Sequence, residues 1–198
     1  ASEALYFTMH SICDPGDEVI IPEPFYANYN GFAQASDVKV IPVTSNIKDN
    51  FALPSIEVFE KKINNRTKAI LICNPCNPTG YVYSKEEIIK IANLAKKNDL
   101  FIIVDEVYRE FIYSDLKHFS ILEDETFFDN AILIDSTSKR YSLCGARIGF
   151  IVSKNSNFIE TCMKFALARL SPPTVALIAA NNALKSDNKY IDNVIKEY

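Results

Sequence analysis

The most regular feature of the chain is a series of short apolar runs separated by longer amphipathic stretches. The runs are apolar throughout and do not alternate with polar residues, which is typical of strands whose two sheet faces are both covered by helices. We therefore expect an α/β fold, with three α/β/α layers around a mostly parallel central sheet. The runs predict strands at residues 18–21, 39–42, 69–72, 101–104, 131–135 and 148–152.

The stretches between and after these runs have helical periodicity. The segment 84–97 has the clearest start signal, because Ser84 is followed three positions later by Glu87, the pattern of a capping box. Residues 4–12 also carry an apolar periodic pattern. The periodicity predicts helices at residues 26–35, 55–62, 84–97, 157–170, 174–185 and 188–198.

Composition limits the classes of protein to which the chain can belong. Its 198 residues, 48% of them apolar, suffice for one well-buried domain. The net charge is −4 and no stripe of Lys and Arg interleaved with aromatics occurs, so we expect no nucleic-acid partner. The apolar runs are far shorter than the ~20 residues that span a bilayer, and no leader-like segment opens the chain. We therefore expect a cytoplasmic protein without a membrane partner.

The chain has five cysteines, an odd number that does not favour a disulfide scaffold. Cys73 and Cys76 have C-x-x-C spacing, but they begin a Pro-rich turn, and no second pair or His cluster accompanies them. Redox or zinc chemistry is therefore not expected. We expect free thiols that pack in or beside apolar stretches at Cys13, Cys73, Cys144 and Cys162.

Polar residues of several chemical kinds follow three successive predicted strands. In open α/β sheets, ligands bind beyond the carboxyl ends of the strands, so these are the positions at which chemistry is expected. The first strand end offers an amide, the second a carboxylate and a phenol, and the third an amine with hydroxyls. The residues concerned are Asn77, then Asp105 and Tyr108, then Ser136, Ser138 and Lys139.

This set suits a phosphorylated aldehyde with a pyridine ring, which indicates pyridoxal 5'-phosphate as the cofactor. Lys139 would form a Schiff base with the aldehyde, and Arg147, eight positions later, would bind the phosphate with the nearby serines. A buried carboxylate such as Asp105 favours a protonated ring nitrogen, which makes the ring an electron sink. Asn77 and Tyr108 are candidate donors to the phenolic oxygen. Tyr26 could supply an aromatic face.

Three motifs carry a resemblance to a known family. They are N-P-C-N-P-T-G at residues 74–80, D-E-V-Y at 105–108, and S-T-S-K-x7-R-x-G at 136–149. In this order and spacing they resemble the large domain of fold-type I, class I/II aminotransferases of the aspartate aminotransferase family. The resemblance covers nearly the whole chain.

The resemblance implies a role for each matching residue. It implies that Lys139 holds the cofactor and then moves the α-proton of the substrate, and that Asp105 pairs with the pyridine nitrogen. It further implies that Ala1 and Ser2 are the remainder of a phosphate-binding loop at a helix N-terminus. The remaining implied roles are contacts to the ring oxygen by Tyr108 and Asn77, stacking by Tyr26, and phosphate binding by Arg147, Ser136 and Ser138.

The resemblance also implies a domain organisation and partners. Family members are considerably longer, so we expect residues 1–198 to form a single cofactor-binding large domain, with the N-terminal arm and the C-terminal small domain absent. We expect weak or undetectable turnover from this domain alone. The expected substrates are an amino acid and a 2-oxo acid, and the expected assembly is a homodimer. Which amino acid is used is not readable from the chain.

Two other functions fit the same motifs. A β-eliminating C–S lyase shares the fold and would yield pyruvate and a thiol from cystathionine. An aminotransferase-like effector domain of a transcription regulator would bind the cofactor as a signal and would follow a DNA-binding module. Outside the motifs, Glu106 is expected to support or orient neighbouring structure, and His10 and His118 are expected to lie at the core edge or the surface without partners in the motif set.

Overall fold

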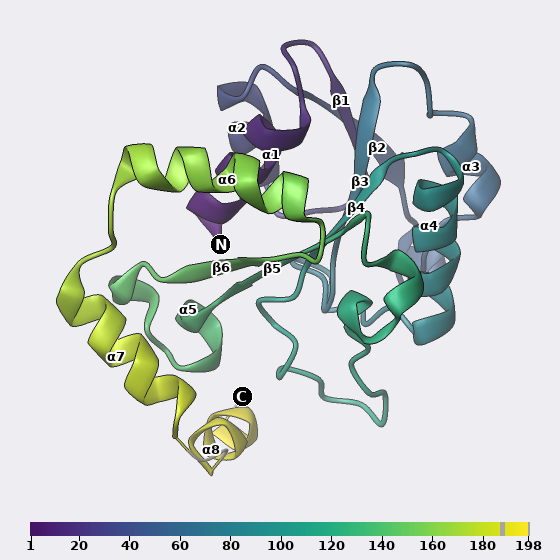
Figure 1. Cartoon of the computed structure of the whole chain (residues 1–198). Helices are drawn as coiled ribbons and strands as arrows, with labels where there is room; N and C mark the ends of the chain where they lie inside the picture. Colours follow the sequence, from purple (N-terminus) through teal and green to yellow (C-terminus); the bar gives the residue numbers. More distant parts are fainter. Residues whose placement is uncertain (187–188, 198) are drawn as a thin grey trace.

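The computed structural model describes residues 1–186 and 189–197, and its centre is a single six-stranded sheet (Figure 1). The order is β2-β1-β3-β4-β5-β6; neighbours among β1 to β5 are parallel, and β6 runs antiparallel to β5. The prediction of a mostly parallel sheet is confirmed. The strands are β1 (Glu18–Glu23), β2 (Lys39–Thr44), β3 (Thr67–Cys73), β4 (Phe101–Asp105), β5 (Ala131–Ser136) and β6 (Gly149–Val152).

Each predicted helix has a counterpart in the structure, and the capping box of the fourth helix is confirmed. The Ser84 hydroxyl accepts a hydrogen bond from the Glu87 amide, and the Glu87 carboxylate accepts one from the Ser84 amide at 2.8 Å. The two ends of the predicted segment 188–198 lie outside the described residues. The helices are α1 (Ser2–Ile12), α2 (Asn28–Ala35), α3 (Ile56–Glu60), α4 (Lys85–Lys97), α5 (Thr137–Arg140), α6 (Ser156–Arg169), α7 (Thr174–Leu184) and α8 (Lys189–Glu197).

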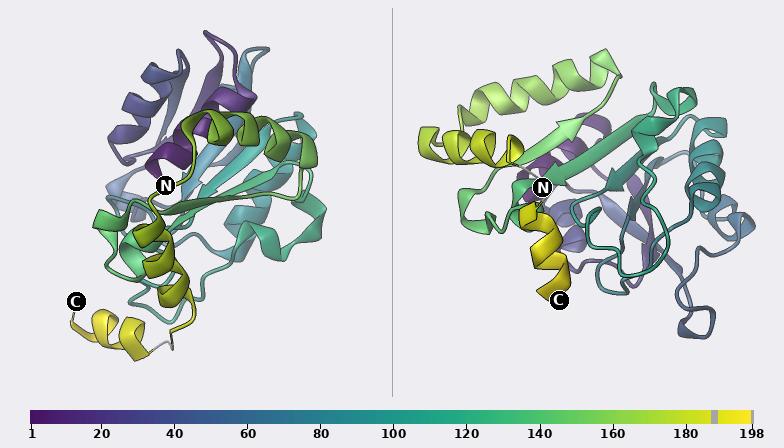
Figure 2. Two further views of the ribbon diagram at one scale, coloured as in Figure 1. Left: turned by 60° about the vertical axis from the view of Figure 1, so that its left-hand side comes forward. Right: turned by 90° about the horizontal axis from the view of Figure 1, so that it is seen from below.

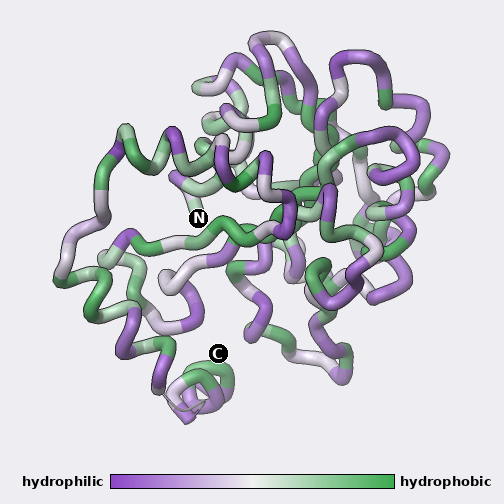
Figure 3. Tube along the Cα trace, in the orientation of Figure 1, coloured by the Kyte–Doolittle hydropathy of each residue, from purple (hydrophilic) through white to green (hydrophobic). Residues whose placement is uncertain are grey.

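Apolar side chains point to both faces of the sheet, which gives the protein two cores. In β3, Ile70 and Ile72 pack with residues of α3 and α4, whereas Ala69 and Leu71 pack with residues of α1, α2 and α6. Figures 1 and 2 show these two groups of helices on opposite sides of the sheet, and the central strands are green in the hydropathy colouring of Figure 3. The three-layer α/β/α prediction is therefore confirmed.

The last two helices are arranged differently from the others. Both lie to one side of the sheet in the views of Figures 1 and 2. In α7 only Ala180 is buried, and the helix contacts the short turn Cys144–Ala146. Several of its large apolar residues are exposed, including Val175 and Ile178.

The cysteine prediction is confirmed in part. All five cysteines are free, and Cys73 and Cys162 are buried, but Cys144 is exposed. The expectation for Cys144 was wrong because its apolar neighbours form a surface turn and not part of a core. Within the described residues no group of His, Cys, Asp or Glu could hold a metal ion. No helix of the described part is both long enough and apolar enough to cross a membrane.

Candidate active site

The carboxyl ends of β3, β4 and β5 open into one cavity of about 230 Å³, called here the site cavity. These strands are neighbours in the sheet and run in the same direction, so the polar residues that follow them meet at one edge. Residues at the start of α1 and before α2 complete the wall. All nine predicted site residues line this cavity: Ser2, Tyr26, Asn77, Asp105, Tyr108, Ser136, Ser138, Lys139 and Arg147.

Lys139 projects from α5, a helix of only four residues. The helix begins at the end of β5, where the hydroxyl of Ser136 accepts a hydrogen bond from the Ser138 amide at 3.0 Å. The Nζ atom of Lys139 lies 5.4 Å from the centroid of the Tyr108 ring. The amine thus lies over the face of the Tyr108 ring, and both residues line the site cavity.

Asp105 is the buried acid of the cavity, with 4% of its surface exposed. The hydroxyl of Tyr29 donates to one carboxylate oxygen at 2.8 Å, and the amide of Val107 donates to the other at 3.3 Å. Burial raises the pKa of Asp105 to about 6, although both of these hydrogen bonds lower it. A buried carboxylate held by neutral donors would strongly favour a cation placed beside it.

Tyr29 is a site residue that the sequence interpretation missed. It is fully buried, it lines the cavity, and burial followed by the charge of Asp105 raises its pKa, so it remains a proton donor to that carboxylate. Tyr29 could have been predicted from its position three residues after Tyr26 at the start of a helix, because this spacing puts two side chains close together. The two rings meet edge to face, with centroids 5.5 Å apart.

Hydroxyls and a guanidinium gather at the other end of the cavity. The Ser136 hydroxyl lies 2.8 Å from that of Ser138 and 3.0 Å from the Ile148 carbonyl oxygen. Arg147 has a left-handed backbone conformation, with φ of 58°, and its guanidinium donates to the Cys144 carbonyl at 2.8 Å. These donors come from the end of β5, from α5 itself and from the turn that follows it, and together they suit an anion.

The first turn of α1 lies beside this group of donors. Ala1 and Ser2 line the cavity, and backbone N–H groups in the first turn of a helix have no intrahelical acceptor. A Cβ atom at position 149 would overlap the backbone of Ala1, so Gly149 is what allows β6 and the start of α1 to lie this close. The sequence thus brings a helix N-terminus to the anion-binding end of the cavity.

A second cavity, of about 770 Å³, adjoins the first and shares Asn77, Tyr108, Ser138, Lys139 and Cys144 with it. The remaining wall is largely apolar. Lys139 therefore lies where the two cavities meet, which leaves room beside its amine for a second molecule.

With this geometry established, comparison with known proteins identifies the family. The family model described as aminotransferase class I and II matches residues 1–197. The chain belongs to the class I and II aminotransferases. Among its relatives, an aspartate aminotransferase of Pyrococcus abyssi is 33% identical over all of this chain and 51% of its own length, and one of Thermotoga maritima is 36% identical over all of this chain and 52% of its own.

Solved aminotransferase structures have the same fold. An aromatic aminotransferase from Pyrococcus horikoshii superposes with a TM-score of 0.92 at 32% identity, covering all of this chain and 53% of its own. The chain therefore spans about half the length of the curated relatives and solved structures it matches. These relatives are named for amino transfer, and none of the names favours the lyase or the regulator.

The residues of the aminotransferase chain fit pyridoxal 5'-phosphate. The cavity holds an amine for the aldehyde, a buried carboxylate for a cationic ring nitrogen and a group of donors for a phosphate. Asn77 and Tyr108 would reach the ring oxygen, and the half-buried ring of Tyr26 would supply an aromatic face. No residue that lines the cavity conflicts with this assignment.

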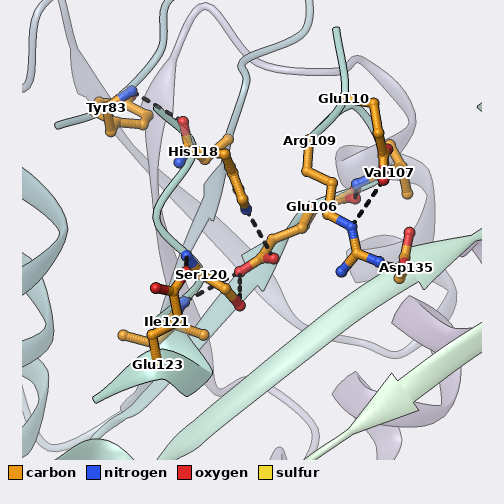
Figure 4. Close-up of polar contacts among 12 residues, drawn as sticks. Tyr83, Glu106, Val107, Arg109, Glu110, His118, Ser120, Ile121, Glu123 and Asp135 are labelled. Atoms are coloured by element: carbon orange, nitrogen blue, oxygen red, sulfur yellow. Dashed lines mark hydrogen bonds and ion pairs between the residues drawn. The ribbon is translucent and has the colours of Figure 1, made fainter. Parts of the chain in front are cut away.

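Next to the cavity, Glu106 is part of a separate buried network, shown in Figure 4. Its carboxylate is 0% exposed and lies 3.0 Å from His118 Nε2; it also accepts hydrogen bonds from the Ser120 hydroxyl at 2.9 Å and the Ile121 amide at 3.2 Å. The expectation that Glu106 supports its neighbours fits this geometry. The expectation that His118 has no partner among the motif residues was wrong, because no sequence pattern reveals that the loop after Tyr108 returns to β4.

Proposed function

We propose that the protein containing this chain transfers an amino group from an amino acid to a 2-oxo acid with pyridoxal 5'-phosphate, and that this chain is the cofactor-binding large domain. The observation that carries the proposal is the convergence of the nine site residues on one cavity, with the Lys139 amine facing Tyr108. Membership of the aminotransferase family supports it independently.

Each site residue has a task in this reaction. When bound, the cofactor supplies an electron sink for the negative charge that develops at the substrate's Cα. The Nζ atom of Lys139 would anchor the cofactor covalently and, when its amine is free, would accept the proton that leaves the substrate's Cα and pass it on. Asp105 keeps a positive charge on the ring nitrogen, because separating a buried carboxylate from its cationic partner is costly.

The other residues bind and orient. Tyr108 and Asn77 donate hydrogen bonds to the ring oxygen, and Tyr26 packs on the ring face. The phosphate is bound by the first turn of α1 with Ser2 and by Ser136, Ser138 and Arg147.

The proposed partner of the chain is a second copy of itself. The resemblance implies a homodimer, and the exposed apolar residues of α6 and α7 offer a surface for one, since monomers rarely expose large contiguous apolar patches. These residues include Leu167, 68% exposed, and Val175, 80% exposed. Light scattering of the full-length protein tests this: a mass of two chains that falls to one in Val175→Asp supports it. A single-chain mass in the unsubstituted protein contradicts it.

A cytoplasmic location is a further part of the proposal. The five cysteines are all free, which fits a reducing compartment.

The test of function uses the purified full-length protein loaded with pyridoxal 5'-phosphate. Aspartate and aromatic amino acids are each mixed with 2-oxoglutarate, and the appearance of glutamate is measured, with Lys139→Ala as the matched inactive variant. We expect glutamate from at least one donor and none from the variant. Pyruvate and a thiol formed from cystathionine, with no glutamate from any donor, would instead establish the lyase.

A further inference from the structure

Outside the lining of the site cavity, four charged side chains form a closed ring with alternating signs, called here the charge ring. Arg140 Nη2 lies 2.9 Å from Asp135 Oδ2, and Arg140 Nε lies 2.6 Å from Glu110 Oε1. Arg109 joins the same two carboxylates, at 3.1 Å from Glu110 and 3.4 Å from Asp135. The Arg109 side of the ring is visible in Figure 4.

The ring joins the two backbone segments whose side chains face each other in the cavity. Arg109 and Glu110 directly follow Tyr108, and Arg140 directly follows Lys139. Asp135 lies at the end of β5, and its carboxylate also accepts a hydrogen bond from the Ser136 amide at 2.7 Å. The ion pairs of the charge ring therefore connect the backbone next to Tyr108 with the backbone next to Lys139.

Neither segment is held in place by a long helix or a strand of its own. The helix α5 is a single turn, which gains little stability from its own hydrogen bonds. The segment after Tyr108 runs to residue 117 without a regular helix or strand, and the Glu106 network secures only its far end, at residues 118–121. Nothing in the Glu106 network reaches α5.

We propose that the charge ring is a positioning device, in which Arg140 sets the distance and orientation of Tyr108 relative to Lys139. This inference rests on the proposed function, since it assigns the ring's effect to the cofactor held between these two residues. Arg140 is 7% exposed and is the ring member on the Lys139 helix. Its planar guanidinium contacts two different carboxylates, with a hydrogen bond from Nη2 to Asp135 and an ion pair between Nε and Glu110, which the single amine of a lysine does not reproduce.

The test is a double-mutant cycle in the cofactor-loaded full-length protein. The variants are Arg140→Met, Tyr108→Phe and the double variant, and the measured quantity is the midpoint pH at which the absorbance of the Lys139-bound cofactor changes. We expect each single variant to shift the midpoint by about one pH unit, a tenfold change in proton affinity, and the double variant to shift it no further than Tyr108→Phe does. An unchanged midpoint in Arg140→Met, or shifts that add in the double variant, would overturn the proposal.

A second readout needs no cofactor. Hydrogen exchange of peptides covering residues 107–112 is measured in the cofactor-free protein, with Lys97→Met as the control because it removes one positive charge from a surface pair with Glu60. We expect exchange about tenfold faster in Arg140→Met and in Arg140→Lys, and unchanged in the control. Equal exchange in all proteins would overturn the proposal.

A variant that fails to fold, and a failure of the proposed function, can both be told apart from a failure of the charge-ring proposal. If Arg140→Met does not fold, Arg140→Met combined with Glu110→Gln removes one charge of each sign and takes its place in both measurements. If the unsubstituted protein forms no covalent adduct with the cofactor, the proposed function fails, while the hydrogen-exchange result still decides whether the ring holds the segment after Tyr108.

Discussion

Two buried acids stand next to each other at the end of β4, and they belong to two different regions of the molecule. Asp105 lines the site cavity and is held by the Tyr29 hydroxyl and the Val107 amide. Glu106 lies against the end of the loop that follows Tyr108 and is held there by His118, Ser120 and Ile121. Both are almost completely buried, so burial alone does not distinguish an acid that does chemistry from one that holds the fold.

The difference lies in what each carboxylate faces. The donors of Glu106 all come from one segment of this chain, so its hydrogen bonds close a loop. Asp105, by contrast, lines an open cavity even though two donors bind its carboxylate. Burial raises the pKa of Asp105 to about 6. The comparison indicates that Glu106 stabilises the protein, whereas Asp105 costs stability that a bound cation would recover.

The largest stability effect is expected from Glu106→Ala. The substitution leaves one buried and two partly buried donors without their acceptor, and each buried donor costs roughly 1–3 kcal/mol, so we expect a loss of about 3–5 kcal/mol in the free energy of unfolding. Denaturant unfolding of the cofactor-free protein measures it, with Glu60→Ala, which breaks only a surface pair, as the control. A loss as small as that of the control would contradict the structural role of Glu106.

Asp105→Asn is expected to have the opposite effect on stability. The folded pKa of about 6 lies above the ordinary 3.8, so the folded protein holds this proton more tightly than the unfolded one. Stability from this group is complete below about pH 4 and is lost as the pH rises through about 6, by up to about 3 kcal/mol. Asparagine has no such proton to lose, so the cofactor-free variant becomes the more stable protein at about pH 8.

The same Asp105→Asn substitution is expected to weaken cofactor binding, because it removes the partner of the cationic ring nitrogen. Thermal unfolding at several pH values measures the stability of the variant, and a cofactor titration measures its affinity for the cofactor. If the variant were less stable than the unsubstituted protein at about pH 8, or bound the cofactor equally well, the contrast between the two acids would be wrong.

A smaller effect is expected from Arg147→Ala, which should weaken binding only of the phosphorylated form of the cofactor. Its guanidinium lies at the end of the cavity where Ser136 and Ser138 meet, so the substitution should lower affinity for pyridoxal 5'-phosphate by about tenfold or more and leave affinity for unphosphorylated pyridoxal nearly unchanged. Arg66→Ala, at an exposed arginine that does not line the cavity, is the control. Equal losses for both ligands would remove Arg147 from the phosphate site.

The sequence alone was enough to predict the regular elements of the fold. Each strand appears within two residues of its predicted limits, because continuous apolar runs are needed wherever helices cover both faces of a sheet. The antiparallel direction of β6 and the single-turn helix α5 were not predicted. Both depend on how the short segment 137–148 turns back against β5, for which the sequence has no periodic signal.

For the site, residues that follow strands were predictable and residues that support them were not. Lys139, Asp105 and Asn77 were found because strand order brings their positions to one edge. Tyr29 and the charge ring were missed because their partners come from segments distant in sequence. The sequence shows that four charged residues are present but not that their side chains meet; these residues are Arg109, Glu110, Asp135 and Arg140.

The most direct test of the account is to locate the cofactor's attachment. The full-length protein is incubated with pyridoxal 5'-phosphate, reduced with borohydride and digested, and the modified peptide is identified by mass spectrometry. The account predicts a single reduced adduct on Lys139, which is lost in Lys139→Ala and retained in Lys97→Ala. No adduct, or label spread over several lysines with Lys139 not preferred, would contradict the assignment of the site cavity to this cofactor.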